Sequence, residues 1–256
     1  MNDTTTTPPI TKATAGHGWL WFRKGYRLFM QSPINWVAMC VLLMAGILVL
    51  SMIPVASLLL QIVMPGFSAG LMLAAHASQR GEPINIGYLI AGFKRNSNEL
   101  ITLGVISFIA NALILIIAAI LVAIFGDTSF VETLSSMESG AIPSPEMLNT
   151  LLVLLLLIVA LSIPLLMALW FAPALVVLNN LKALDAFKTS FAACNRNMIP
   201  FLVYGLVGIP LMIAAALPVG LGFVVLIPIV FCSIYCMWRD VFDNSQEQKQ
   251  PIARNT

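Results

Sequence analysis

The stretch that decides the fold is SIPLLMALWFAPALVVLNNLKALDAFKTSFAACNRNMIPFLVYG, residues 162–205. An apolar run interrupted by proline comes first, a basic amphipathic segment follows over 179–197, and a new apolar run begins at Met198. Proline inside a helix removes a hydrogen bond and bends or breaks the helix. The stretch is typical of a helical membrane protein in which apolar spans alternate with short segments at the membrane surface.

The composition places the whole chain in the same class. Of its 256 residues, 59% are hydrophobic and 9% are charged, whereas a soluble domain carries about 25% charged residues. A chain this apolar avoids aggregation only when lipid covers most of its surface, so we expect an integral membrane protein. The net charge of +2 is too small to indicate a nucleic-acid partner.

Six apolar runs are long enough to cross a bilayer, which takes about 20 helical residues. The predicted spans are 35–53, 55–77, 100–125, 151–178, 198–217 and 219–238. They make up one membrane domain over 18–243. The polar ends, 1–17 and 244–256, are expected to be cytoplasmic tails, the first of them disordered. The acidic connection over 126–149 is the predicted periplasmic loop.

The basic residues give the expected orientation. With six spans, all 13 Lys and Arg residues of the chain fall on the side of the two tails. Because loops rich in Lys and Arg stay in the cytoplasm, the sequence predicts that both termini are cytoplasmic. The expected location is the inner membrane of a bacterium.

Three basic amphipathic segments precede the odd-numbered spans, at 19–32, 86–95 and 179–197, and are predicted to be interfacial helices. In the first, four aromatic residues recur at helical spacing and are expected on one face: Trp19, Phe22, Tyr26 and Phe29. The candidate lipid-headgroup residues of the three segments are Arg23, Lys24, Arg27, Lys94, Arg95, Lys182, Lys188 and Arg196. Anchoring alone is the alternative role for these cations.

An internal repeat follows from the prolines. Each even-numbered span contains a helix-break candidate: Pro65, Pro173 and Pro228. A small residue followed by an aromatic one precedes each odd-numbered span, and these small residues are Gly25, Gly92 and Ser190. The pattern predicts three pseudo-repeats of interfacial helix, span and proline-broken span in one orientation. Chance matches between apolar sequences are the alternative. The expected fold is all-α: six transmembrane helices and three cytoplasmic interfacial helices.

The sequence carries no motif of a known enzyme class, and the span interiors hold no Asp, Glu, Lys or Arg, which ion-coupled carriers need. We therefore expect no catalytic residue, no metal site and no cofactor. The leading hypothesis is a non-enzymatic protein that engages membrane lipids or a membrane-protein partner, a second copy of the chain included. The alternative is a small-solute or lipid transporter with a cavity between the proline-broken helices.

Two groups of residues carry a resemblance to known families. One is Gly18-Trp19-Leu20-Trp21-Phe22 with Gly25, Phe29 and Ser32-Pro33; the other is Ala172-Pro173-Ala174-Leu175-Val176 with Ala186, Ser190-Phe191 and Asn197. The chain resembles an uncharacterised family of proteobacterial six-span inner-membrane proteins over most of 18–242. It is distantly similar to the membrane domain of glycerophosphodiester phosphodiesterases. Their soluble catalytic domain has no counterpart in this sequence, so the resemblance implies an inner-membrane location and no assigned activity.

Overall fold

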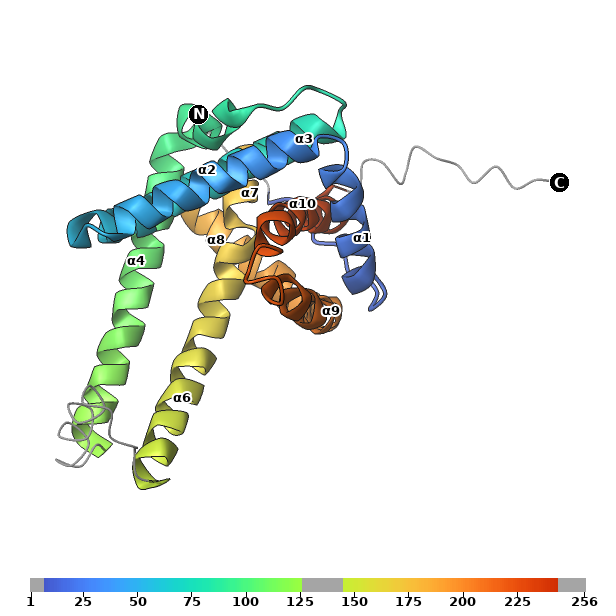
Figure 1. The fold of residues 1–256 in the computed structure, drawn as a ribbon. Coiled ribbons are helices and arrows are strands. Elements are labelled where there is room, and N and C mark those ends of the chain that lie inside the picture. Colours follow the sequence, from blue (N-terminus) through green and yellow to red (C-terminus); the bar gives the residue numbers. More distant parts are fainter. Residues whose placement is uncertain (1–6, 126–144, 244–256) are drawn as a thin grey trace. The chain divides into compact units, whose positions relative to one another are not determined.

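The computed structural model describes residues 7–125 and 145–243, and their regular elements are all helices, with no strand (Figure 1). Its helices, with one short 3-10 helix, η1, are α1 (His17–Phe29), α2 (Pro33–Ser51), α3 (Pro54–Gln79), η1 (Ile86–Ile90), α4 (Ala91–Phe125), α6 (Pro145–Trp170), α7 (Ala172–Asn179), α8 (Ala183–Arg196), α9 (Met198–Ala216) and α10 (Phe223–Phe242).

Six stretches of the described chain are long and apolar enough to cross a membrane. They are Pro33–Ser51, Pro54–Gln79, Ile86–Ile124, Leu151–Asn179, Met198–Ala216 and Phe223–Phe242. The predicted all-α membrane fold with six spans is therefore confirmed. The predicted periplasmic loop, as far as residue 144, and the C-terminal tail lie outside the described residues. The location of the short helices at a membrane surface stays a prediction.

The chain divides into two compact units. The larger contains residues up to Val105 and from Met167 onward, and the smaller is Ile106–Leu166. In the larger unit α1 packs on α9 and α10, while α3 packs on η1 and α7. Its core contains the fully buried side chains Trp21, Trp36, Phe171, Leu175 and Met237.

The described residues of the smaller unit belong to α4 and α6, and most of their large apolar side chains are exposed. In the described part of this unit, two polar side chains bond to their own helix. The amide of Asn111 donates to the Ser107 carbonyl at 3.0 Å, and the hydroxyl of Ser162 donates to the Ile158 carbonyl at 2.7 Å. This pattern suits helices in lipid, where water does not satisfy polar groups.

Several boundaries differ from the predicted spans. The last span begins at Phe223 rather than at 219, because residues 217–222 form a turn, and it continues to Phe242. The predicted second interfacial segment is joined to the third span. η1 leads into α4, and the backbone of Asn96 leaves the helical conformation with φ −139° and ψ 47°. A bend without proline separates the amphipathic part from the apolar part there.

The predicted helix breaks need correction. α3 continues through Pro65 and α10 continues through Pro228, so the prediction of a break is wrong at both prolines. Backbone groups in lipid have few alternatives to helical hydrogen bonds, so the chain stays helical past a proline although one bond is lost. A break does occur at Phe171, and Pro173 lies at the start of the new helix, α7. Proline suits that position because its missing N–H would be unpaired there anyway.

The turn between α9 and α10 contains a strained residue whose replacement should stabilise the protein. Val219 has φ +54°, a left-handed conformation that a β-branched side chain rarely adopts, and its side chain is 96% exposed. We expect Val219→Gly to raise the free energy of unfolding by about 1 kcal/mol, measured by thermal unfolding in detergent. The control Val225→Gly, inside α10, should lower stability by about 0.5–1 kcal/mol. An unchanged melting temperature for Val219→Gly would contradict the strain.

Candidate functional site

The candidate site consists of the outward faces of three amphipathic elements: α1, the segment 86–95 (η1 and the start of α4), and α8. All three belong to the larger unit. They carry the eight cations predicted to meet lipid headgroups. Each element has an inward face that packs on an apolar helix and an outward face that no described residue covers.

The faces of α1 differ from the prediction. Phe22 and Phe29 are buried with Trp21 and Leu28, whereas Trp19 is 56% exposed. The outward stripe of α1 alternates apolar and basic side chains at helical spacing: Trp19, Arg23, Tyr26, Arg27 and Met30. The four aromatic residues expected on one face are thus divided, because the inner face needs aromatic bulk as well. An outward mixture of aromatic and basic residues is what the headgroup region of a bilayer favours.

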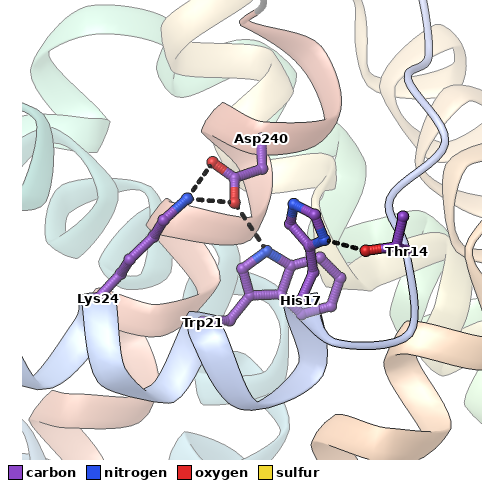
Figure 2. Close-up of polar contacts among 5 residues, drawn as sticks. All are labelled: Thr14, His17, Trp21, Lys24 and Asp240. Atoms are coloured by element: carbon purple, nitrogen blue, oxygen red, sulfur yellow. Dashed lines mark hydrogen bonds and ion pairs between the residues drawn. The ribbon is translucent and has the colours of Figure 1, made fainter.

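Lys24 belongs to the inner side of α1, so its assignment as a free headgroup cation is wrong. Its ammonium lies 2.9 and 2.7 Å from the two carboxylate oxygens of Asp240 in α10 (Figure 2). The indole Nε1–H of Trp21 donates to the same carboxylate at 3.1 Å. These three hydrogen bonds fasten α1 to the end of α10. No sequence pattern had pointed to Asp240.

A glycine lets α1 approach α10 closely. A Cβ atom at Gly25 would lie 2.7 Å from the backbone nitrogen of Ser233 and 2.8 Å from its Cα. The hydroxyl of Ser233 is paired with the hydroxyl of Tyr204 in α9 at 2.6 Å. The ring of Tyr204 stacks on Phe22 with centroids 4.1 Å apart. The inner face of α1 is therefore a close-packed contact with both α9 and α10.

The chain ahead of α1 is also bound to the larger unit. The backbone N–H of Ala13 donates to Oδ1 of Asn197 at 2.7 Å, and Nδ2 of Asn197 donates to the Thr11 carbonyl at 3.1 Å. The Thr11 N–H donates to the Val241 carbonyl at 2.8 Å. Disorder over the whole of 1–17 is therefore wrong for the described part of that tail. The physical reason is the buried amide of Asn197, which needs partners. Closer to α1, Thr14 bonds to the ring of His17 at 2.8 Å (Figure 2).

The segment 86–95 repeats the two-faced arrangement. Ile86, Ile90 and Lys94 are exposed four residues apart, and Arg95 is exposed beside them. Inward, a Cβ atom at Gly92 would collide with the carbonyl oxygen of Gly66 in α3. Leu89 and Phe93 turn toward α3, and Phe93 packs edge-on against Phe67. The carboxamide oxygen of Asn96, at the bend, is buried without a hydrogen-bond partner in the described chain.

α8 is the third element with an outward and an inward face. Outward it exposes Leu184, Lys188 and Phe191, with Lys182 and Arg196 exposed at its two ends. Inward, the hydroxyl of Ser190 accepts from the backbone N–H of Phe171 at 2.9 Å and donates to the Met167 carbonyl at 2.8 Å. These bonds satisfy backbone groups at the break between α6 and α7.

Two further side chains lie in this region. No sequence pattern pointed to Glu99, and Cys194 has no role in the site. Glu99 accepts from the Ala183 N–H at 2.7 Å and so caps the start of α8. Burial raises the pKa of the Cys194 thiol to about 12, while the neighbouring Ser190 opposes that shift. The thiol therefore stays protonated at neutral pH and is a poor nucleophile or metal ligand.

The three elements share one packing rule. A small inward residue, Gly25, Gly92 or Ser190, meets α10, α3 or the α6–α7 junction respectively. The segment 86–95 and α8 each pack on the even-numbered span that precedes them along the chain, and α1 packs on the last even-numbered span, α10. In α3 and α10, the residues that the small side chains contact follow Pro65 and Pro228 in sequence. At the α6–α7 junction they precede Pro173, so the three prolines do not occupy equivalent packing positions. The shared packing of the small inward residues, and not the prolines, therefore supports the internal repeat.

Seven of the eight candidate cations are exposed: Arg23, Arg27, Lys94, Arg95, Lys182, Lys188 and Arg196. The salt bridges within the described chain join Lys24 to Asp240 and Arg80 to Glu82, so none of the seven is neutralised by a carboxylate there. They are spread over three elements rather than gathered in one cluster. This distribution suits many weak contacts with a charged surface better than a single anion-binding pocket.

Comparison with known proteins agrees with a membrane protein of this kind. No protein-family model matches the chain, and no solved structure matches it. It is 26% identical, over 271 aligned positions, to a curated protein of Burkholderia thailandensis described as a probable inner membrane protein. The alignment covers 96% of this chain and 98% of that relative. The resemblance to glycerophosphodiester phosphodiesterases stays a prediction. The chain is a polytopic membrane protein, similar over nearly its whole length to a probable bacterial inner membrane protein.

Proposed function

We propose that the protein has a non-enzymatic role in which α1, the segment 86–95 and α8 bind the headgroups of anionic phospholipids. One observation carries the proposal. Each of the three elements turns bulky apolar side chains and unpaired cations outward in the same stripe. Exposing these apolar side chains to water is unfavourable, and burying the cations in hydrocarbon is costly. The headgroup region of a bilayer accepts both.

The expected electrostatic attraction is strong enough for headgroup binding. A Lys or Arg close to an anionic membrane surface contributes about 1 kcal/mol of attraction. α8 and the segment 86–95 offer two or three such residues each, and the spans already hold them at the membrane. Screening limits the attraction to about 8–10 Å at physiological salt, so the cations must lie at the surface itself.

We further propose that this surface is the cytoplasmic one, with both termini in the cytoplasm. The support is the distribution of Lys and Arg along the sequence, all of which lie on one side of a six-span chain. The transporter alternative is less well supported, because it relied on helices broken at three prolines and α3 and α10 continue through theirs. A membrane-protein partner or a second copy of the chain stays a prediction.

The test replaces the cations of one element. In Lys182→Gln/Lys188→Gln/Arg196→Gln, we expect the thermal stabilisation that cardiolipin or phosphatidylglycerol confers on the purified protein to fall by at least half. Stabilisation by phosphatidylcholine, which has no net charge, should not change. The measurement is the melting temperature in detergent with increasing amounts of each lipid.

A matched control separates local binding from net charge. Lys12→Gln/Lys249→Gln/Arg254→Gln removes the same charge from the two ends of the chain and should respond to anionic lipid like the wild type. If the α8 variant also responds like the wild type, the proposal fails for α8, and its cations serve orientation alone. A loss of response in both variants would make the effect one of net charge and would equally overturn the proposal.

A further inference from the structure

Two turns of the larger unit have a surface that suits lipid chains rather than water. They are the α2–α3 turn (Ser51–Ser57) and the α9–α10 turn (217–222). We infer that both end within the acyl-chain layer of the leaflet opposite the basic elements, with fatty-acyl chains as their binding partner. The inference does not depend on headgroup binding by α8.

Large apolar side chains are exposed at both turns. Met52 is 76% exposed and Val55 68%, while Leu217 is 79% and Leu221 71% exposed. The α9–α10 turn has the sequence LPVGLG and contains no polar side chain. A turn that met water would expose this apolar surface at a cost of about 25 cal/mol per Å². The same surface is favourable against acyl chains.

Several polar groups of the α2–α3 turn are satisfied internally, as a hydrocarbon environment favours. Its two serine hydroxyls donate to their own helices, Ser51 to the Leu48 carbonyl at 2.8 Å and Ser57 to the Pro54 carbonyl at 2.6 Å. The backbone N–H groups of Met52 and Ile53 also donate to carbonyls of α2, at 3.3 and 3.1 Å. Pro54 has no N–H to satisfy.

Most backbone N–H groups of the α9–α10 turn also donate within the protein. The N–H groups of Gly220 and Gly222 donate to carbonyls at the end of α9, at 3.0 and 3.2 Å. Those of Leu221 and Phe223 donate to carbonyls within the turn, at 3.1 Å each. Pro218 again removes one donor. Loops in water usually leave several such groups to the solvent, so this closure is a second observation that points to lipid.

The helices that lead into the two turns, α2 and α9, are no longer than the hydrocarbon layer is thick. α2 and α9 have 19 residues each, which is about 28 Å at 1.5 Å per residue. The hydrocarbon layer is about 30 Å thick. In Figure 1, α2 lies across the view, whereas α9 and α10 are seen nearly end-on, so the two hairpins of this unit do not run parallel. At least one of them is therefore tilted in the membrane, and a tilted helix reaches less far.

The connection over 126–149 differs in sequence from the two apolar turns. It carries Asp127, Glu132, Glu138 and Glu146, which require water. The middle pair of spans is thus expected to reach the opposite aqueous phase, while the first and last pairs stop inside the bilayer. The leaflet opposite the basic elements would then surround two apolar tips with its own lipid chains.

The test measures the depth of single nitroxide labels in nanodiscs, where reagents reach both faces. Labels are placed at Met52→Cys and Leu221→Cys in a chain whose four native cysteines are alanine. We expect collision with oxygen to be frequent and collision with a water-soluble nickel chelate to be rare, as at Leu206→Cys in the exposed middle of α9. Ser139→Cys in the acidic connection should show the opposite pattern. Frequent collision with nickel at a tip, at the level of Ser139→Cys, overturns the inference for that hairpin.

Discussion

Gly25→Val is expected to detach α1 and to lower the free energy of unfolding by about 3 kcal/mol or more. The new side chain would meet backbone atoms of Ser233, at 2.7–2.8 Å from the Cβ position, and backbone does not move aside as a flexible side chain does. Separation of α1 would expose the buried face that contains Trp21, Phe22 and Leu28. Thermal unfolding in detergent measures the loss, and trypsin should cleave at Arg23 and Arg27 far faster than in the wild type.

Gly205→Val is the matched control. Gly205 also lies in an apolar helix, α9, but nothing is within 4 Å of a Cβ atom placed on it. The substitution adds the same side chain with no collision, so stability should stay within about 0.5 kcal/mol of the wild type or rise slightly. If the two variants melt at the same temperature, the close contact between α1 and α10 is not what stabilises the larger unit.

Asp240→Ala is expected to lower the free energy of unfolding by about 2 kcal/mol, the second-largest effect. It removes the acceptor of three hydrogen bonds and leaves the Lys24 ammonium and the Trp21 indole N–H without their partner. Breaking a fully buried ion pair costs about 3–5 kcal/mol. The side chains of Lys24 and Asp240 are 28% and 15% exposed, so solvent screening reduces the figure. The measurement is again thermal unfolding.

A double-mutant cycle isolates the pair itself. Lys24→Met/Asp240→Ala removes both charges, and it should be more stable than the sum of the two single losses predicts, by about 1 kcal/mol. Additive losses would mean that the two side chains stabilise the fold independently, and the ion pair would then not be what fastens α1 to α10.

The six spans were predictable because each depends on composition over about 20 residues, which a local window captures. Helix ends were less predictable, since they depend on individual bonds. The start of α10 at Phe223 follows from the hydrogen bonds of the 217–222 turn, not from hydropathy. Whether a proline breaks its helix was also not encoded locally. Pro65 lies within a continuous helix, whereas Pro173 follows a break whose free backbone groups Ser190 satisfies.

The exposure of seven of the eight cations was predictable from the sequence, but the faces that the helices turn inward were not. The spacing of Trp19, Phe22, Tyr26 and Phe29 indicates a helix, but lipid and protein both accept aromatic side chains. Glycine was the more informative signal, because Gly18 and Gly25, seven residues apart, mark the face that approaches other helices. The partners Lys24 and Asp240 are 216 residues apart in sequence. No local pattern could have joined them.

The packing of α1 on α10 has a consequence for the order of assembly. A ribosome produces α1 first and α10 last, so the first helix has no docking surface until almost the whole chain has been synthesised. Until then the apolar inner face of α1 must be covered by lipid or by a chaperone. The outward stripe can already rest on the membrane during this interval, which would keep the helix near the place where its partner emerges. Final assembly of the larger unit is therefore a late, long-range step, of the kind that folds slowly.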